Sequence, residues 1–260
     1  MLTIMNEAML SKLSLTAKNA AHKAGSILGE HRSSYLKVNF ESASDVKLQA
    51  DVESETLIRE ILNKESGLPI IGEEQGGDES LIHSDDYYWV IDPLDGTYNY
   101  LRDMPLTCVS IGLMKGLKPV LGVIHDFNLE ETYSAISGQG IYINEKKLNP
   151  NWADEAKQAC LMTGFPAGRS YSTEALNLFV SRVQRFKKIR MIGSAALALA
   201  YVASGRGDIY LEESIRLWDI AAGLALVEAG GGHLQIQLVD AKELKFNICA
   251  AGNKDWLLLN

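Results

Sequence analysis

Two carboxylates stand three residues apart at the end of an apolar run, Trp89-Val90-Ile91-Asp92-Pro93-Leu94-Asp95. The run is typical of a buried strand, and acids at a strand end can bind hard divalent cations, which prefer oxygen ligands. Gly96 and Thr97 follow at an expected helix start, where backbone N–H groups can bind an anion such as phosphate. This spacing indicates metal-assisted phosphate chemistry. The alternative is an ordinary turn, because Asp-Pro and Asp-Gly are common turn dipeptides.

Two further acidic positions could complete such a site. Glu73 follows a short apolar strand, Leu68-Pro69-Ile70-Ile71-Gly72, and Asp219 lies in the first turn of a helical run of small residues. Asp219 could instead do no more than complement the helix dipole. Open α/β sheets bind ligands at the carboxyl ends of their strands. Acids placed after two strands and at a helix start are therefore expected to meet in one crevice.

Composition narrows the classes of partner. The 260-residue chain carries 25 Lys and Arg against 33 Asp and Glu, a formal net charge of −8. An acidic chain without a basic cluster is a poor prospect for binding nucleic acid. Its apolar runs are shorter than the roughly 20 residues that span a bilayer, and charged residues interrupt any signal-peptide core. Three widely spaced cysteines favour buried free thiols. We expect a cytoplasmic protein with no nucleic acid or membrane partner.

The elements that must position these acids follow from hydrophobic periodicity, which predicts a first half of strands with helices on one side. Helices are expected over about 6–31 and 46–64, and Asp45 is the expected cap of the second. Strands are expected at 35–40, 69–72, 87–91, 107–114, 119–126 and 131–136, with a hairpin that reaches about 143.

The second half alternates strands and helices as α/β units do. Strands are expected at 160–163, 187–191, 208–212, 233–238 and 245–251, and helices at 172–185, 194–204 and 219–229. Gly230-Gly231-Gly232 follows the last helix as a stop signal. The turn cluster Asn149-Pro150-Asn151 is the best boundary candidate. It divides the chain into an N-terminal domain, 1–148, and a C-terminal domain, 149–260.

Taken together, the motifs resemble the inositol monophosphatase family of magnesium-dependent, lithium-sensitive phosphatases. The matching segments are Gly72-Glu73-Glu74, Asp92-Pro93-Leu94-Asp95-Gly96-Thr97, Gly193-Ser194-Ala195-Ala196 and Trp218-Asp219-Ile220-Ala221-Ala222-Gly223. They stand in the family's order at about its spacing, and the resemblance covers nearly the whole chain. It implies a mixed α+β and α/β fold of the sugar-phosphatase (fructose-1,6-bisphosphatase-like) type, a layered α-β-α-β-α sandwich, and a homodimer.

The resemblance also implies the metal site. Two or three Mg²⁺ ions would be bound by the side chains of Glu73, Asp92, Asp95 and Asp219 and by the carbonyl of Leu94. Asp51, on the second helix, stands where the family has an acid that acts with Thr97 on the attacking water. With Glu73, these two residues form the expected catalytic set. An exposed helical charge is the alternative for Asp51, and Leu48 stands where the family usually has a hydroxyl residue.

Substrate contacts are carried over in the same way. The phosphate is expected at Asp95, Gly96, Thr97 and Asp219. The matched loop Gly193, Ser194 and Ala195 is expected to line the substrate ring, and Gly164-Phe165-Pro166 matches a turn near the site. Glu212, seven residues before Asp219, is expected to accept hydrogen bonds from substrate hydroxyls, with Glu213 as the alternative register. Arg216 could contact substrate or lie at the surface.

The combined prediction is a Mg²⁺-dependent phosphatase of a small polyol or sugar phosphate, with inositol 1-phosphate as the first candidate. A 3′-phosphoadenosine 5′-phosphate phosphatase, a fructose-1,6-bisphosphatase and a histidinol-phosphatase remain open. A different class of function would be a non-catalytic regulatory protein that keeps the fold. All four acids and Thr97 are present, which favours the enzyme.

Overall fold

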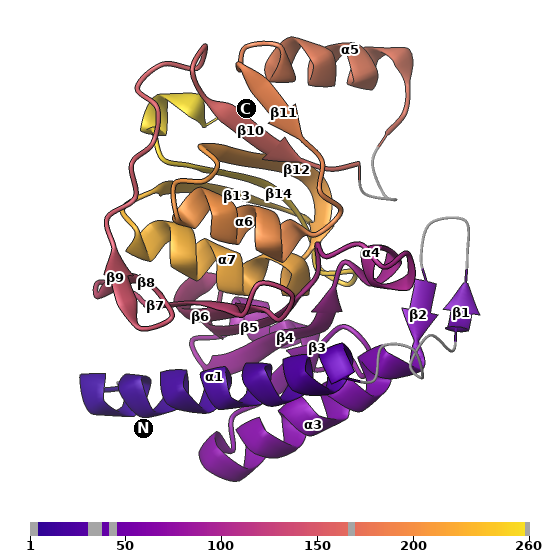
Figure 1. The fold of residues 1–260 in the computed structure, drawn as a ribbon, viewed down its shortest axis with the longest axis vertical. Helices are drawn as coiled ribbons and strands as arrows, with labels where there is room; N and C mark the ends of the chain where they lie inside the picture. The colour runs from indigo at the N-terminus through magenta and orange to yellow at the C-terminus, as the bar shows by residue number, and fades with distance from the viewer. Residues whose placement is uncertain (1–4, 31–37, 42–45, 166–169, 258–260) are drawn as a thin grey trace.

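The computed structural model describes residues 5–30, 38–41, 46–165 and 170–257, and for 38–41 and 46–48 it describes the backbone. Its helices and sheets form five layers, α-β-α-β-α (Figure 1). Helices α1 and α3 cover the outer face of one sheet, α6 and α7 lie between the two sheets, and α5 lies on the far side of the second. The layered fold that the resemblance implied is confirmed.

The first sheet is built from one continuous stretch of chain. Its seven strands lie in sequence order, and all neighbouring pairs are antiparallel except β3 and β4. The strands are β3 (Ile70–Gly72), β4 (Tyr87–Asp95), β5 (Cys108–Lys115), β6 (Lys118–Asp126), β7 (Glu131–Ile136), β8 (Gly140–Ile143) and β9 (Lys146–Leu148).

The second sheet has five strands in the order β11-β10-β12-β14-β13. They are β10 (Cys160–Thr163), β11 (Lys188–Arg190), β12 (Ile209–Arg216), β13 (His233–Asp240) and β14 (Lys245–Ala251). Strand β10 is parallel to both of its neighbours, and the other pairs are antiparallel. The change from one sheet to the other falls between β9 and β10, near the turn cluster of the sequence. The division into two domains there stays a prediction.

The helices are α1 (Glu7–Glu30), α3 (Gln49–Ser66), α4 (Thr97–Leu101), α5 (Thr173–Val183), α6 (Ala195–Ala203) and α7 (Leu217–Ala229), with 3-10 turns η1 (Glu79–His83) and η2 (Lys254–Trp256). Helix α7 ends at Ala229, as the glycine run predicts. None of the described helices is long and apolar enough to cross a membrane.

Helix α7 lies close against the first sheet because two of its strands carry glycine at the contact. A Cβ on Gly112 of β5 would come within 2.8 Å of the Ala222 backbone nitrogen, and a Cβ on Gly122 of β6 would also meet the Ala222 backbone. Ala221 and Ala222 are fully buried there. This close approach brings the first turn of α7, and with it Asp219, next to the end of β4.

The prediction for residues 46–64 is wrong at its start. The helix begins at Gln49, and Val46–Leu48 forms the short strand β2, which pairs antiparallel with β1 (Val38–Glu41). The backbone groups of 46–48 therefore bond across a hairpin, which offers them partners that a first helical turn would lack. The expected cap, Asp45, and residues 35–37 of the predicted strand lie outside the described residues. The sequence analysis also missed η1.

Candidate active site

Asp92 and Asp95 reach the same side of the sheet because β4 is irregular between them. In a regular strand, side chains three residues apart point to opposite faces. Asp92 pairs with Ser110 of β5 and Asp95 pairs with Cys108, so three steps along β4 match two along β5. This bulge redirects Asp95. It also accommodates Pro93, which has no N–H to donate to the ladder.

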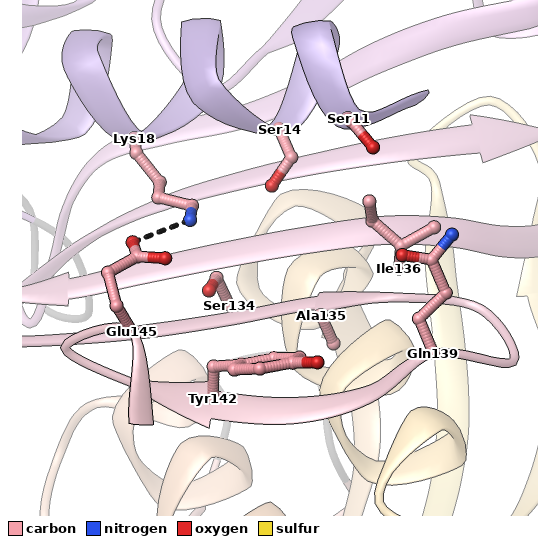
Figure 2. Close-up of a pocket in the computed structure, with 9 residues that line it drawn as sticks. All are labelled: Ser11, Ser14, Lys18, Ser134, Ala135, Ile136, Gln139, Tyr142 and Glu145. Carbon is pink, nitrogen blue, oxygen red and sulfur yellow. Dashed lines mark hydrogen bonds and ion pairs between the residues drawn. The ribbon is translucent and has the colours of Figure 1, made fainter. Parts of the chain in front are cut away.

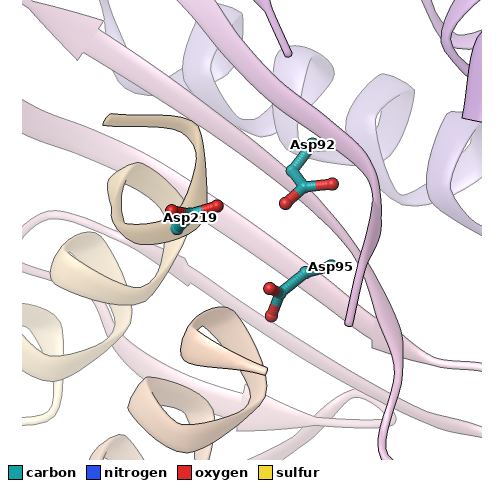
Figure 3. Close-up of side chains that lie close together, drawn as sticks. All are labelled: Asp92, Asp95 and Asp219. Carbon is teal, nitrogen blue, oxygen red and sulfur yellow. The ribbon is translucent and has the colours of Figure 1, made fainter. Parts of the chain in front are cut away.

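Asp219 joins this pair from the first turn of α7 (Figure 3). Each of the three carboxylates offers one oxygen, and these oxygens all lie within 4.8 Å of one another. Asp92 and Asp95 are buried, whereas Asp219 is half-buried. The backbone N–H of Arg216 donates to Asp219 Oδ2 at 3.2 Å, and that of Leu94 donates to Asp92 Oδ1 at 3.0 Å. Two acids of one strand thus meet a third acid from a distant part of the sequence.

Each carboxylate of the cluster is hard to ionise without a cation. Burial raises the pKa of Asp92 well above its ordinary value, and the charges of Glu73, Asp95 and Asp219 raise it further. Burial followed by the charges of Asp95 and Glu212 does the same to the pKa of Asp219. Like charges gathered in a desolvated place repel one another, so this arrangement costs stability unless a cation binds.

Asp95 differs from the other two because the start of α6 holds it. The Ser194 hydroxyl and the Ala196 N–H, the latter at 2.8 Å, both donate to Asp95 Oδ2. Burial raises the pKa of Asp95, while these hydrogen bonds act in the opposite direction. Ser194 also caps α6 by accepting from the Leu197 N–H at 3.3 Å. The predicted residues Asp95, Ser194 and Ala195 are therefore neighbours in space.

Glu73 lies at the end of β3, close enough to raise the pKa of Asp92. Its loop is tied to α3 by Glu55, a fully buried carboxylate. Glu55 accepts from the Glu74 N–H at 2.7 Å and the Gln75 N–H at 3.0 Å, and Arg59 Nε donates to it at 2.7 Å. The sequence analysis missed Glu55, although a Glu and an Arg four residues apart on one helix face was a usable signal.

Asp51 lies in the first turn of α3 and is only 2 % exposed, so the alternative of an exposed helical charge is wrong. Thr97 opens α4, and its hydroxyl donates to the Leu94 carbonyl at 3.1 Å. Gly96, the residue before α4, has a φ of 91°, which few residues other than glycine adopt. The joint role of Asp51 and Thr97 stays a prediction.

A pocket of about 230 Å³ opens beside the carboxylates. Both sheets and the start of α6 contribute to its wall. It is lined by Asp95, Thr163, Gly164, Phe165, Gly193, Ser194, Ala195, Ala198, Tyr210, Glu212, Ile215 and Asp219. The pocket thus brings the metal-site candidates Asp95 and Asp219 together with the predicted substrate residues of the 193–195 loop and Glu212.

The structure favours Glu212 over Glu213 as the substrate acid. Glu212 lines the pocket, is 8 % exposed, and accepts from the Tyr210 hydroxyl at 2.7 Å. Glu213 points to the other side of β12 and forms an ion pair with Arg182 at 2.7 Å. Gly164 leaves room for the Glu212 carboxylate, which a Cβ there would meet at 2.7 Å. Tyr210 was not predicted, since nothing in the sequence shows that it pairs with Glu212.

Arg216 lies at the end of β12, outside the pocket lining. It forms an ion pair with Glu243, Nη2 to Oε2 at 2.8 Å, and its guanidinium lies over the Trp218 ring at 5.4 Å. A contact with substrate therefore stays a prediction.

Asn99 connects the two sides of the site and was also missed. Its amide nitrogen, on α4, donates to the carbonyl oxygens of Ile192 at 2.8 Å and Gly193 at 3.2 Å, and of Leu106 at 2.9 Å. Gly193 has a φ of 71°. These bonds hold the 193–195 loop next to the start of α4.

Comparison with known proteins agrees with this geometry. A family model described as the inositol monophosphatase family matches residues 9–254. The chain belongs to this family. It is 37% identical over 221 residues to a protein of Xylella fastidiosa named Nus factor SuhB, covering 83% of this chain and 78% of that one. It is 34% identical over 227 residues to an Aquifex aeolicus protein named fructose-1,6-bisphosphatase/inositol-1-monophosphatase, covering 86% and 85%.

Solved structures of inositol monophosphatase family proteins are also similar. The inositol monophosphatase from Anabaena superposes with a TM-score of 0.79 at 31% identity, covering 95% of this chain and 93% of that one. The extragenic suppressor protein suhB from Bartonella henselae gives 0.81 at 29% identity, covering 94% and 95%. The resemblance that the four motifs indicated is confirmed, and the chain is an inositol monophosphatase-like phosphatase.

The acidic cluster fits the metal dependence that is general in the inositol monophosphatase family. Its donors are oxygens alone, which suits a hard divalent cation. Their raised pKa values have a direct cause in burial and mutual repulsion, and a cation among them would remove both costs.

Proposed function

We propose that this phosphatase is Mg²⁺-dependent and hydrolyses a small polyol phosphate, with inositol 1-phosphate as the first candidate substrate. The observation that carries the proposal is that Asp95, Asp219 and Glu212 line the same pocket of about 230 Å³. A candidate cation site for the phosphate and an acceptor for hydroxyl groups thus open into one space.

Two or three Mg²⁺ ions would be held by the side chains of Glu73, Asp92, Asp95 and Asp219 and the carbonyl of Leu94. Bound there, the ions supply positive charge to the phosphate oxygens and lower the pKa of water. The protein's part is to keep these oxygens in place before the ions arrive. The Leu94 and Arg216 N–H groups orient Asp92 and Asp219, and Ser194 and Ala196 orient Asp95.

The remaining residues bind the substrate and move its proton. Asp51 and Thr97 orient the attacking water, and Asp51 takes its proton as general base. The N–H groups of Gly96 and Thr97, at the start of α4, would bind the phosphate. Glu212 accepts hydrogen bonds from the hydroxyls of the polyol, and the Tyr210 hydroxyl keeps its carboxylate aimed into the pocket.

A phosphate-release assay over a substrate panel tests the proposal. We expect hydrolysis of inositol 1-phosphate that stops in EDTA and returns with Mg²⁺ but not with Ca²⁺, whose geometry is larger and looser. Turnover that persists in excess chelator contradicts the metal-dependent mechanism. Faster turnover of fructose 1,6-bisphosphate, histidinol phosphate or 3′-phosphoadenosine 5′-phosphate would move the substrate to that class.

The substrate role of Glu212 has a matched control in its neighbour. We expect Glu212→Gln to lower kcat/KM for inositol 1-phosphate by about ten- to a hundredfold, as the loss of a charged hydrogen-bond partner does. Hydrolysis of p-nitrophenyl phosphate, which has no polyol, should change little. Glu213→Gln, whose partner is Arg182, should leave both substrates unaffected. Equal loss on both substrates after Glu212→Gln would place this residue outside the substrate site.

Lithium provides a separate test, which rests on the family alone. We expect Li⁺ to take one of the Mg²⁺ positions after cleavage and so to inhibit uncompetitively with substrate. A KCl series of the same ionic strength is the control, and equal inhibition by both salts would contradict a specific effect.

A regulatory function is the second candidate, because several relatives carry the name Nus factor SuhB. A chain that serves only as a binding protein would release no phosphate from any member of the panel. The proposal also includes a homodimer and a cytoplasmic location. Light scattering in solution tests the first, and cell fractionation tests the second.

A further inference from the structure

A second pocket, of about 190 Å³, lies between helix α1 and the β7–β8 hairpin (Figure 2). It shares no lining residue with the candidate active site. Its wall is mostly polar. It is lined by Ser11, Ser14, Lys18, Ser134, Ala135, Ile136, Gln139, Tyr142 and Glu145.

The α1 side of this pocket is a polar stripe next to the buried apolar face of the helix. Ser11, Ser14 and Lys18 are spaced by three and four residues, so they lie on one face of the helix. The neighbouring face buries the apolar residues Leu13, Ala17, Ala20, Ala24 and Leu28 against the first sheet. The stripe therefore lies beside the apolar contact with the sheet and is not part of it.

Two serines that line the pocket are mostly buried, and their hydroxyls have no protein partner within the described chain. Ser14 is 6 % exposed and Ser134 is 4 % exposed. Among the residues that the structure describes, neither side chain has a hydrogen bond. Figure 2 shows both directed into the space between α1 and the hairpin. Both hydroxyls can therefore donate and accept hydrogen bonds with a molecule bound in the pocket.

One wall of the pocket is held by a residue in an unfavourable backbone conformation. Asn144 and Glu145 form the two-residue turn between β8 and β9, with φ of 45° and 64°. Such turns favour glycine at the second position, yet Glu145 stands there and forms an ion pair with Lys18 at 2.7 Å. A pair that is 75 % exposed on the Glu145 side contributes little stability. The turn is therefore less stable than one with glycine at this position, and it places a carboxylate at the pocket mouth.

The lining specifies the chemistry of the occupant. Lys18 and Glu145 neutralise each other, so the pocket has no net charge to attract an anion. The serine hydroxyls and the Gln139 amide both donate and accept hydrogen bonds, which matches hydroxyl groups that do the same. The Tyr142 ring, opposite Ser134 across the strand pair, forms a flat floor (Figure 2) of the kind on which a sugar ring can lie.

We propose that the pocket between α1 and the β7–β8 hairpin binds a small neutral polyhydroxylated molecule, a free polyol or sugar, separately from the active site. The occupant carries no phosphate, so it belongs to the chemical class that hydrolysis of a polyol phosphate releases. The site itself stands on the pocket's own residues and does not depend on the proposed function.

Saturation-transfer NMR with methyl β-glucopyranoside as the probe tests this site. We expect transfer from the native protein and from Glu212→Gln, which is altered only in the active site. Ser14→Ala combined with Ser134→Ala should lower the affinity for the probe by about ten- to a hundredfold, since each neutral hydrogen bond contributes a factor of about three to ten. Ser137→Ala, an exposed serine of the adjacent turn that is not in the lining, is the matched control and should bind normally.

Two further measurements check that the variants fold and that the pocket prefers a neutral molecule. The double variant should keep its kcat for phosphate release, and Tyr142→Leu, made separately, should also lose the probe while it keeps kcat. Inositol 1-phosphate should compete for this pocket at least tenfold more weakly than the neutral probe. The proposal is overturned by an absence of transfer from the native protein, by transfer that Glu212→Gln removes, by undiminished binding to the double variant, or by equal competition from the phosphate.

Discussion

The acidic cluster and the Arg206 network both join the half of the chain with the seven-stranded sheet to the half with the five-stranded sheet, but their charges are arranged differently. Arg206, between α6 and β12, binds both oxygens of Glu131 on β7, and the Tyr133 hydroxyl donates to the same carboxylate at 2.6 Å. Its guanidinium also lies 5.8 Å from the Tyr133 ring. Every charge there has a partner of opposite sign.

The acidic cluster has the opposite arrangement. Asp92 and Asp95 of β4 and Asp219 of α7 bring like charges together in a buried place. Their raised pKa values and the lowered pKa of Glu131, which Arg206 causes, show the contrast directly. Paired charges fasten the fold, whereas gathered like charges keep a site ready for a ligand at a cost in stability.

The largest expected effect separates the two arrangements at Asp92. We expect Asp92→Asn to lower kcat by about 10²–10³-fold, as the loss of a group that stabilises transition-state charge does. Without divalent cations, the same variant should melt about 2–4 °C higher, which corresponds to roughly 1 kcal/mol for a chain of this size. Calorimetry in EDTA measures it. Asp95→Asn is the control, because its amide oxygen can still accept from Ser194 and Ala196 but without the charge that strengthens these bonds. It should therefore gain less stability than Asp92→Asn. A lower melting temperature for Asp92→Asn would contradict the repulsion argument.

The next effect concerns the Arg206 network and has the opposite sign. Arg206→Met should leave kcat within about twofold and lower the free energy of unfolding by roughly 1–2 kcal/mol, since it removes a bidentate, partly exposed ion pair. Arg190→Met is the control, because within the described part of the chain the Arg190 guanidinium donates only to the adjacent Ile189 carbonyl. Urea unfolding measures both variants. If Arg206→Met abolished activity without loss of stability, this network would belong to the site.

The pH dependence of the metal-free protein sharpens the comparison further. In the folded state the pKa values of Asp92 and Asp219 are raised, so the native protein binds protons that the unfolded chain has already released. Proton binding by these two carboxyl groups stabilises the folded state at low pH, and this stabilisation is lost as pH rises through their raised pKa values. Between pH 5 and 7 we therefore expect the melting temperature in EDTA to fall more for the native protein than for Asp92→Asn. Saturating Mg²⁺ should remove this difference between the two proteins. Melting temperatures that fall equally with pH for both proteins in EDTA would contradict the argument.

The smallest effect comes from a third buried group, His125. Its Nδ1 lies 3.0 Å from the Thr132 hydroxyl, and burial together with the neighbouring His22 lowers its pKa to about 4. In the unfolded chain the imidazole takes up a proton at about pH 6.5, whereas the buried ring stays neutral until about pH 4. The stability that comes from burying the neutral ring is therefore lost as pH falls from about 6.5 towards 4. In Mg²⁺, the melting temperature of His125→Gln should fall less steeply than that of the native protein as pH is lowered over this range. His233→Gln, which alters a half-buried histidine of β13, should not, and a decline unchanged by His125→Gln would contradict the argument.

Local sequence determined most of the elements and the identity of the site. The spacing of apolar residues predicted α1, α6 and α7 and nearly all the strands, because burial on one face imposes a period that the chain itself displays. The pair of carboxylates around Pro93, with the Trp218-Asp219 segment, indicated the family. Where the prediction failed, at residues 46–48, the hairpin partner β1 decided the structure, and such pairing leaves no local signal.

Tertiary structure alone decided what these residues contact. A bulge in β4 placed Asp92 and Asp95 on one side, and two glycines of the sheet let α7 bring Asp219 to them. Tyr210, Glu55 and Asn99 hold Glu212, the Glu73 loop and the 193–195 loop, yet each is an ordinary polar residue in the sequence. The physical reason is that a hydrogen bond depends on the distance and direction between two atoms. Partners about a hundred residues apart, such as Asp95 and Ser194, reach the required distance and direction only when the layers pack.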